Sequence, residues 1–284
     1  MPANTPKLGI LAGGGDLPLK LAQACQAKGR GFLMIGLEGC AGPEIEAYPH
    51  EWSALGSVAR TYKLLRDAGC SEVVLAGNVR RPDFRQIKPD RKGAVLLAKV
   101  VGAAVRGDGA LLSVIIQDIE HEGFKVIGAD DVLAELIARP RVMTRAAPSA
   151  RDLRDIAKAI EVVNALGRLD IGQGAVVCEG LVLAVEAAEG TDRMLERCAL
   201  LPAAIRGTPE DRRGVLVKLP KPRQELRVDL PTIGLPTIER AAAAGLAGIA
   251  VKAGGALIMD EASLIARADA LGLFVAGIDA SDDT

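Results

Sequence analysis

The chain has 284 residues, a length that allows two modest domains or one large α/β domain. Hydrophobic residues make up 49% of it and charged residues 25%, which is typical of a folded protein and excludes a disordered chain. The 35 Lys and Arg residues nearly cancel the 36 Asp and Glu residues, and aromatic residues are only 2%, so we expect no nucleic-acid partner.

The first half of the chain is predicted to alternate between strands and helices. We expect strands at 7–12, 31–35, 72–76 and near 124–127, and helices at 17–28, 57–68 and two or three times within 89–137. A Gly/Pro loop that contains Trp52 is expected before the second helix. Because strands joined by helices form parallel sheets, we predict a Rossmann-like N-terminal domain over residues 1–140.

The second half is predicted to form a separate domain over residues 141–284. Proline and arginine interrupt the pattern at 139–141 and 147–149, where Ser149 can cap a helix over 151–166. Further helices are expected to begin at 191, 237 and 261, and strands at 175–178, 181–186, 214–219, 226–230, 248–251, 256–259 and 273–278. Because strands outnumber helices, this C-terminal α/β domain is predicted to hold a mixed sheet.

Cysteine and histidine are too sparse for several kinds of site. The five cysteines form no CxxC pair, which argues against a zinc ribbon or a disulfide framework and fits a reducing cytoplasm. His50 and His121 are too few for a two-metal or HExxH hydrolase, and no GxSxG motif is present, so we interpret both as surface residues in a loop and at a helix end. We also expect neither an export signal nor a membrane span.

The first candidate site is the segment 11–18, which follows a predicted strand and opens a helix. Gly14 and Gly15 let the backbone pass close to a ligand, and the free N–H groups of a helix start can bind phosphate or a sugar hydroxyl. Asp16 is a poor neighbour for phosphate and could instead serve a nucleoside hydroxyl or a metal. A tight turn with Asp16 as helix cap explains the same residues, and both alternatives stay open.

Two further candidates are polar segments at predicted strand ends. In 169–177, turn chemistry explains the glycines but not Gln173. In 186–192, the carboxylates of Glu186 and Asp192 could hold a hard cation such as magnesium that bridges phosphates. Thr191 as helix cap and Asp192 as a favourable first-turn charge would account for this segment equally well.

The segment 218–234 concentrates positive charge in a chain that is otherwise close to neutral. Its cations could form a pyrophosphate clamp, and they are Lys218, Lys221, Arg223 and Arg227. Arg227 and Asp229 are two residues apart in the expected strand 226–230, so their side chains would share one face. A charged edge strand would show the same alternation. Lys252, at another predicted strand end beside glycines, could also reach phosphate or be a solvated turn residue.

Taken in order, five segments resemble the LpxI family of UDP-2,3-diacylglucosamine pyrophosphatases nearly end to end: AGGGDLP, DIGQGAVV, EAAEGTD, VKLPKPRQELRVDLPTIG and LGLFVAG. The resemblance implies hydrolysis of UDP-2,3-diacylglucosamine to UMP and 2,3-diacylglucosamine 1-phosphate (lipid X) in lipid A biosynthesis. It also implies Mg²⁺ as cofactor, two domains with the ligand cleft between them, a homodimer, and a cytoplasmic enzyme with peripheral contact at the inner membrane.

The resemblance places the essential aspartate of the family on Asp229, which we predict to be catalytic, by holding magnesium or positioning the attacking water. Glu186 and Asp192 are predicted as further metal or ligand-orienting groups. The predicted substrate-binding residues are Gly14, Gly15, Asp16, Asn78, Gln173, Gly190, Thr191, Lys218, Gln224, Arg227, Thr232 and Lys252. Apolar residues near the helices of the second domain could line a channel for the acyl chains, or belong to the core.

Two other functions fit the residues without the resemblance. A transferase for nucleotide sugars would share the phosphate clamp and pass the sugar to an acceptor instead of water. A carrier or regulator would bind a lipid or nucleotide without turnover. From the residues alone we expect a soluble two-domain α/β protein that binds a phosphorylated small molecule.

Overall fold

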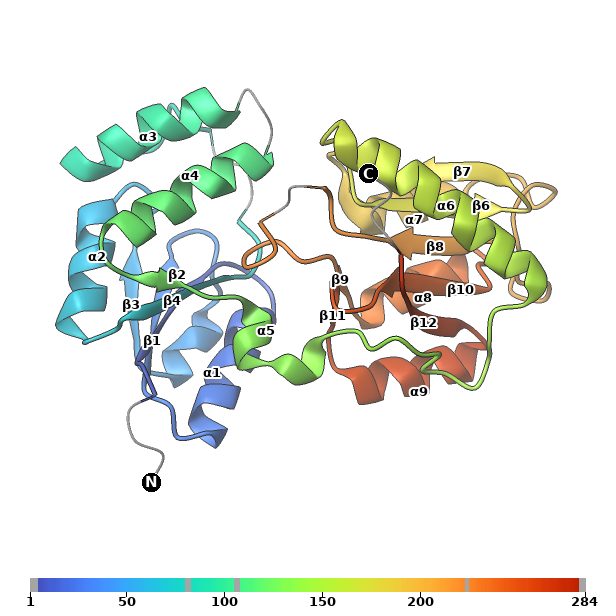
Figure 1. The fold of residues 1–284 in the computed structure, drawn as a ribbon, viewed down its shortest axis with the longest axis horizontal. Coiled ribbons are helices and arrows are strands. Elements are labelled where there is room, and N and C mark those ends of the chain that lie inside the picture. The colour runs from blue at the N-terminus through green and yellow to red at the C-terminus, as the bar shows by residue number, and fades with distance from the viewer. Residues whose placement is uncertain (1–4, 80–82, 105–107, 223–224, 281–284) are drawn as a thin grey trace. The chain divides into compact units, whose positions relative to one another are not determined.

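The computed structural model describes residues 5–79, 83–104, 108–222 and 225–280. The chain forms two compact units, Met1–Ala134 and Glu135–Thr284, called unit 1 and unit 2 below (Figure 1). This division falls six residues before the sequence-based boundary at 140, and both units are α/β, as predicted. No helix among the described residues is long and apolar enough to cross a membrane.

Unit 1 is built on a parallel sheet of five strands in the order β3-β2-β1-β4-β5. The strands are β1 (Leu8–Ala12), β2 (Phe32–Leu37), β3 (His50–Ser53), β4 (Glu72–Ala76) and β5 (Lys125–Val126). The helices are α1 (Leu17–Ala27), η1 (Pro43–Ala47), α2 (Val58–Asp67), α3 (Arg91–Ala104), α4 (Asp108–His121) and α5 (Ala129–Val132), and η2 (Ala134–Leu136) follows at the boundary. The order 3-2-1-4-5 is that of a dinucleotide-binding fold, which confirms the Rossmann-like prediction.

The segment around Trp52, expected to be a loop, is instead the edge strand β3, so that prediction is wrong. His50, which we also expected in a loop, is the first residue of this strand. Trp52 pairs with Gly36 of β2 in parallel register. A Cβ atom at Gly36 would lie 2.7 Å from the Trp52 ring and 2.3 Å from Ile45. Gly36 therefore makes the room in which the indole packs. A strand of four residues is too short to show a clear alternation in sequence.

Unit 2 holds a mixed sheet of five strands in the order β12-β10-β8-β6-β7, as predicted. The strands are β6 (Gly174–Cys178), β7 (Leu181–Val185), β8 (Val215–Lys218), β10 (Gly248–Lys252) and β12 (Phe274–Ile278). β8, β10 and β12 are parallel, whereas β6 runs antiparallel to both of its neighbours. The short strands β9 (Thr232–Ile233) and β11 (Leu257–Ile258) form a separate parallel pair.

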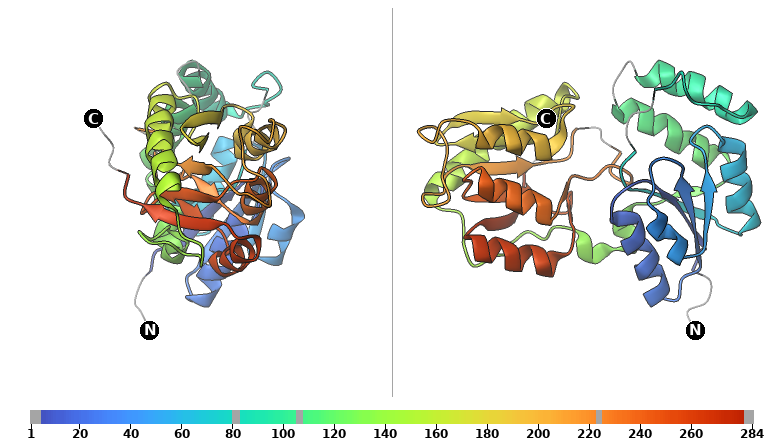
Figure 2. Two further views of the ribbon diagram at one scale, coloured as in Figure 1. Left: turned by 90° about the vertical axis from the view of Figure 1, so that its right-hand side faces the viewer. Right: turned by 180° about the vertical axis from the view of Figure 1, so that it is seen from behind.

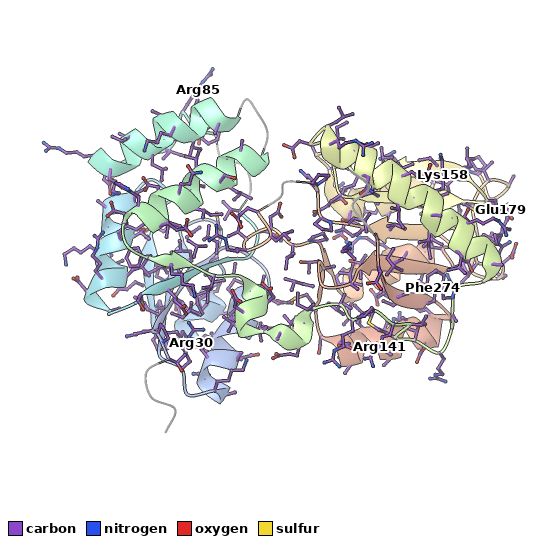
Figure 3. The ribbon with its side chains drawn as sticks, in the orientation of Figure 1. Arg30, Arg85, Arg141, Lys158, Glu179 and Phe274 are labelled. Atoms are coloured by element: carbon purple, nitrogen blue, oxygen red, sulfur yellow. The ribbon has the colours of Figure 1, made fainter. Side chains whose placement is uncertain are left out.

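Helices cover both faces of this sheet, as Figure 2 shows. The helices are α6 (Ala150–Arg168), α7 (Gly190–Ala199), α8 (Leu235–Ala243) and α9 (Glu261–Leu271). Val215, Val217 and Phe274 pack with residues of α6 on one face, and Phe274 is labelled in Figure 3. Leu216 and Val275 belong to the core on the other face, which includes residues of α7, α8 and α9. This alternation buries the strands on both faces.

The strand predicted at 226–230 is absent, because residues 226–228 form a turn. The backbone N–H groups of Val228 and Asp229 both donate to the carbonyl of Glu225, at 3.1 and 3.2 Å. Arg227 and Asp229 therefore do not lie on one strand face, and that prediction is wrong. Prolines on both sides of the segment, at 220, 222 and 231, cannot donate to a sheet ladder and favour irregular backbone.

A buried carboxylate holds the tip of the β6–β7 hairpin. The two turn residues, Glu179 and Gly180, have φ of 51° and 80°, and two positive φ angles are what a type I′ turn requires. Their N–H groups donate to the two carboxylate oxygens of Asp155 on α6, at 2.9 and 2.8 Å. Asp155 is 1% exposed, so these are hydrogen bonds to a buried charge.

We expect Asp155→Ala to lower the free energy of unfolding by about 3 kcal/mol, because it removes two hydrogen bonds to a charged group and leaves two N–H groups without partners. Urea unfolding measures this loss. Glu161→Ala on the same helix, where the side chain is 69% exposed, is the matched control and should change little. Equal stabilities for the two variants would show that Asp155 does not anchor the turn.

Candidate functional site

One edge of the unit 2 sheet collects most of the predicted site residues. Lys218 and Lys252 are the last residues of the parallel strands β8 and β10, and Glu186 follows β7. β6 begins at the same edge, where Gly174 lies opposite Lys218 and Gln173 comes just before it. The strand order, which no local pattern reveals, thus brings together segments that are far apart in sequence.

Lys218 is the buried centre of this edge, with only 4% of the residue exposed. Its ammonium group donates to Thr191 Oγ1 at 2.7 Å and to the carbonyl oxygen of Thr232 at 3.3 Å. Burial lowers the pKa of Lys218, while the carboxylates of Glu186, Asp192 and Asp229 partly offset the effect. The structure therefore brings Lys218, Thr191, Thr232 and these acidic groups into one site.

Thr191 links Lys218 to Glu186, because its hydroxyl accepts from the lysine and donates to Glu186 Oε1 at 3.0 Å. Glu186 is 7% exposed, and its second oxygen, Oε2, is buried with no hydrogen-bond partner among the described residues. The N-cap of α7 is Glu189, and Thr191 is the second helical residue. The alternative interpretation of Thr191 as helix cap is therefore wrong. Gly190, at φ 77°, begins the helix.

The two other acidic residues differ in their surroundings. Asp192 lies in the first turn of α7, its side chain is 51% exposed, and its carboxylate is 3.5 Å from Arg240. Asp229 follows the turn at 226–228 and is partly buried. Its charge acts on Lys218, so the residue that we predict to be catalytic lies within electrostatic reach of the buried ammonium.

Most of the other predicted cations of unit 2 contact the protein itself. Arg227 donates twice to the carboxylate of Glu225, with both distances 2.8 Å. Lys221 pairs with Asp170 at 2.7 Å, and Lys252 donates to the carbonyl of Ala280. Gln224, together with Arg223, lies outside the described residues. Lys218 differs from these cations by its burial and by the three carboxylates whose charge acts on it.

The partners Glu225, Asp170 and Ala280 are absent from the predicted site. Nothing in the sequence singles out the Ala280 carbonyl, whereas the proximity of Glu225 to Arg227 in the sequence could have suggested their pairing. Asp170 was visible only as a turn residue, because its contact with Lys221 spans 51 positions.

In unit 1 the glycine-rich segment lies at the point where the strand order reverses. Gly14 and Asn78 follow the adjacent strands β1 and β4 and exchange two backbone hydrogen bonds, at 2.9 and 2.8 Å. Gly15 and Gly77 have φ of 88° and 89°, which favours glycine at both positions. Ligands of open α/β sheets bind at such switch points. Asp16 occupies the N-cap position of α1, but its side chain makes no capping hydrogen bond.

No three Asp, Glu, His or Cys side chains of the described residues are close enough together to enclose a metal ion. Magnesium seldom needs such a cage, since it keeps several waters and binds one or two carboxylates together with substrate phosphates. Asp229, partly buried near Lys218, and Glu186, with its unpartnered Oε2, are donors of the type that magnesium prefers. The donor set therefore fits an ion shared with a phosphate ligand.

Comparisons with known proteins match both units. The LpxI N-terminal domain matches residues 7–136 and the LpxI C-terminal domain residues 139–276. A protein of Caulobacter vibrioides (strain ATCC 19089 / CIP 103742 / CB 15), named UDP-2,3-diacylglucosamine pyrophosphatase LpxI, is 52% identical over 273 residues, which cover 96% of this chain and 98% of that protein.

Two of the solved structures that match the chain are only distantly similar to it. CobK precorrin-6A reductase is 15% identical with a TM-score of 0.34, covering 98% of this chain and 89% of that one. An N5-carboxyaminoimidazole synthase of Aspergillus clavatus is 13% identical with a TM-score of 0.24, covering 62% and 39%. Neither similarity is close enough to inform the site.

The burial of Lys218 predicts a pH-dependent stability. Because its pKa is lowered in the folded state, the unfolded chain binds more protons between that value and the ordinary lysine pKa, so stability should rise with pH across this window. Lys218→Met removes the group that causes this rise. The difference in unfolding free energy between wild type and variant should therefore grow in favour of wild type as pH rises. Urea unfolding at several pH values measures it.

The matched control is Lys158→Met on α6, where the lysine side chain is 47% exposed and lies on the surface (Figure 3). The unfolding free energy of this variant should change with pH in the same way as that of wild type. If the Lys218→Met and wild-type curves are also parallel, the Lys218 pKa is not lowered by folding.

Proposed function

The chain belongs to the LpxI family, and we propose that it hydrolyses the pyrophosphate bond of UDP-2,3-diacylglucosamine in lipid A biosynthesis. The products are UMP and 2,3-diacylglucosamine 1-phosphate. The name of the 52% identical relative supports this substrate. The observation that carries the chemistry is the buried Lys218 ammonium, which is held by Thr191 and the Thr232 carbonyl and feels the charge of three carboxylates.

The reaction needs a water molecule to attack one phosphorus while the bridging P–O bond breaks. One new P–O bond forms from water, one bond to the bridging oxygen is lost, and the two protons of water are shared between the product phosphates and solvent. Such a transfer depends on positioning and charge neutralisation more than on covalent catalysis. A site that holds a fixed cation and acidic residues can supply both, and it needs no histidine.

In this proposal Lys218 contacts a phosphate oxygen and stabilises the negative charge that develops on the diphosphate. Thr191 and Glu186 keep the ammonium in place and favour its charged form. Asp229 orients the attacking water or holds the cation. Thr232 fixes Lys218 through its carbonyl. Gly190, Gln173 and Arg227 are proposed as further substrate contacts around the same edge.

We also propose Mg²⁺ as the cofactor; Asp229 would hold it, and Glu186 and Asp192 would be further acidic groups that help to hold or orient the ligand. When bound, the ion supplies positive charge to the diphosphate oxygens. In unit 1, the turn with Gly14, Gly15, Asp16 and Asn78 is proposed to bind another part of the substrate. Lys252 as a phosphate contact, a homodimer and peripheral binding at the inner membrane remain predictions.

Incubation of the purified protein with UDP-2,3-diacylglucosamine, with Mg²⁺ or with EDTA, tests the function by mass spectrometry of the products. UMP and 2,3-diacylglucosamine 1-phosphate that form only with Mg²⁺ would support the proposal. Transfer of the sugar phosphate to another acceptor would favour a transferase, and binding without turnover would favour a carrier.

Asp229→Ala is expected to lower kcat by about 100-fold or more, because it removes the group that positions water or the cation, while substrate binding persists. Steady-state kinetics and direct binding of the substrate measure the two effects separately. Asp211→Ala, in an exposed turn of the same unit where Asp211 pairs with Arg213, should retain full activity. Full activity of Asp229→Ala would remove its catalytic role.

Lys218→Met should weaken the binding of UMP by about tenfold or more, since a hydrogen bond to a charged phosphate is lost. Isothermal titration of UMP measures this change. Lys158→Met serves again as the surface control. Unchanged UMP affinity in Lys218→Met would remove Lys218 from the phosphate site.

A further inference from the structure

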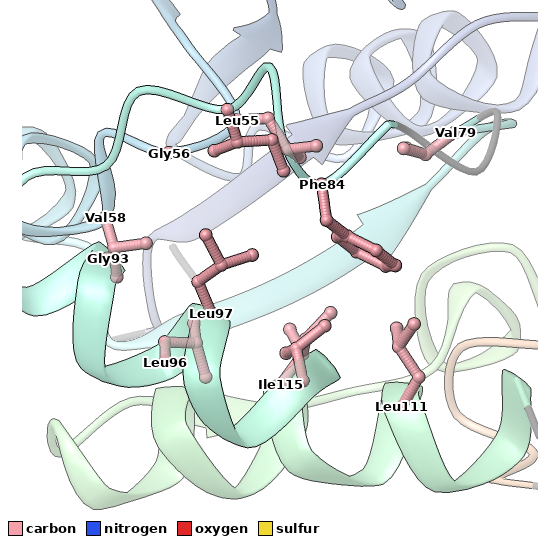
Figure 4. Close-up of a pocket in the computed structure, with 12 residues that line it drawn as sticks. Leu55, Gly56, Val58, Val79, Phe84, Gly93, Leu96, Leu97, Leu111 and Ile115 are labelled. Atoms are coloured by element: carbon pink, nitrogen blue, oxygen red, sulfur yellow. The ribbon is translucent and has the colours of Figure 1, made fainter. Parts of the chain in front are cut away.

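Unit 1 contains an apolar cavity whose lining includes none of the polar site residues described above (Figure 4). It lies between the helices α3 and α4 and the segments that follow β3 and β4, and it has about 580 Å³ of space, its open mouth included. Leu97 of α3, Leu111 and Ile115 of α4, and Phe84 face one another across it. Every lining residue is a glycine or has a hydrocarbon side chain.

This lining decides the chemistry of the occupant. A stable buried water needs two to four polar partners, and the lining side chains offer none. A sugar, nucleotide or phosphate would likewise lose its hydrogen bonds to water without replacement. The occupant that the cavity favours is therefore a hydrocarbon group.

Part of the cavity lining lies at the edge of the unit 1 sheet that carries the glycine-rich turn. Leu55, which is 37% exposed, comes two residues after β3, and Val79, 43% exposed, directly follows Asn78. Asn78 is bonded through its backbone to Gly14 in the glycine-rich turn. An apolar chain that packs against Val79 would thus lie close to a polar group bound at the switch point.

The wall formed by Gly56 and Gly93 is held in place by a set of hydrogen bonds. The Asp90 carboxylate accepts from the N–H groups of Ala59 and Gly93, both at 2.7 Å, and the Asp90 N–H donates to the Gly56 carbonyl at 3.1 Å. A Cβ atom at Gly93 would lie 2.1 Å from that carbonyl oxygen, so α3 approaches the loop as closely as glycine allows. The cavity is therefore a preformed site with a fixed wall.

We propose that this cavity binds one acyl chain of the diacylated sugar substrate, and that Leu97 and Leu111 set the chain length it accepts. The inference rests on the proposed function for the identity of the lipid, while the apolar character of the site is independent of it. It places acyl recognition in unit 1 under α3 and α4, whereas the sequence suggested the helices of the second domain.

Leu97→Trp, which fills the cavity, tests the proposal in the full-length protein. Each methylene that enters an apolar site strengthens binding by about fourfold, so kcat/KM for a substrate with long acyl chains should fall by about tenfold or more. A substrate analogue with two acetyl groups should change less than about twofold, because it does not reach the cavity. Val95→Trp, on the same helix at a position 60% exposed, is the matched control and should match wild type on both substrates.

Binding of the fluorescent fatty acid cis-parinaric acid gives a readout that does not depend on hydrolysis. Leu97→Trp should lose this binding and Val95→Trp should keep it. If wild type binds the probe in this way but leaves UDP-2,3-diacylglucosamine intact, the proposed function fails and the cavity remains a hydrocarbon site for another lipid or a free fatty acid.

Leu111→Ala provides the opposite test, because it enlarges the cavity and should shift the preferred acyl chain toward greater length. It also replaces Leu97→Trp if that variant does not fold, as judged by its thermal unfolding. Unchanged dependence on chain length in a folded Leu97→Trp or Leu111→Ala variant, with unchanged probe binding, would overturn the proposal.

Discussion

A lysine ammonium removed from water is costly, and the candidate site of unit 2 is organised around this constraint. Lys218 ends a central strand that is buried on both faces, so its side chain cannot extend into solvent. The Thr191 hydroxyl, the Thr232 carbonyl and the surrounding carboxylates supply what water would have supplied. They replace it only in part, since the pKa of Lys218 remains lowered. A phosphate ligand would add the negative charge that favours the ammonium form.

Both units place their polar site residues at the carboxyl ends of parallel strands. In unit 2 the antiparallel β6 and its hairpin partner β7 add Gln173 and Glu186 to that edge, because β6 begins and β7 ends there. In unit 1 the edge offers backbone groups around Gly14 and Asn78 beside an apolar cavity. Unit 2 thus has the charges that a diphosphate needs, and unit 1 has the apolar volume that an acyl chain needs.

The sequence predicts most of this structure where the signal is local. Long periodic elements such as α6, with Ser149 and Asp152 in its capping box, agree with prediction, and so do the parallel and mixed sheets. The failures have physical causes. Strand β3 depends on space left by Gly36, and the charged alternation near Arg227 arises from pairing within a turn. Likewise, the partners of Lys218 depend on tertiary contacts that span up to 27 residues, which no local pattern contains. The resemblance of the ordered motifs predicts which residues belong to the site, whereas only the fold shows which side chains they contact.

The most direct test of the role of Lys218 is a pH titration of protein labelled with ¹³C at the lysine Cε atoms, followed by NMR with and without UMP. The signal missing from Lys218→Met assigns the resonance. We predict a Lys218 pKa below that of the surface lysines, and a rise in this pKa when UMP binds, because phosphate favours the ammonium form. A Lys218 pKa that equals those of the surface lysines and is unaffected by UMP would contradict it.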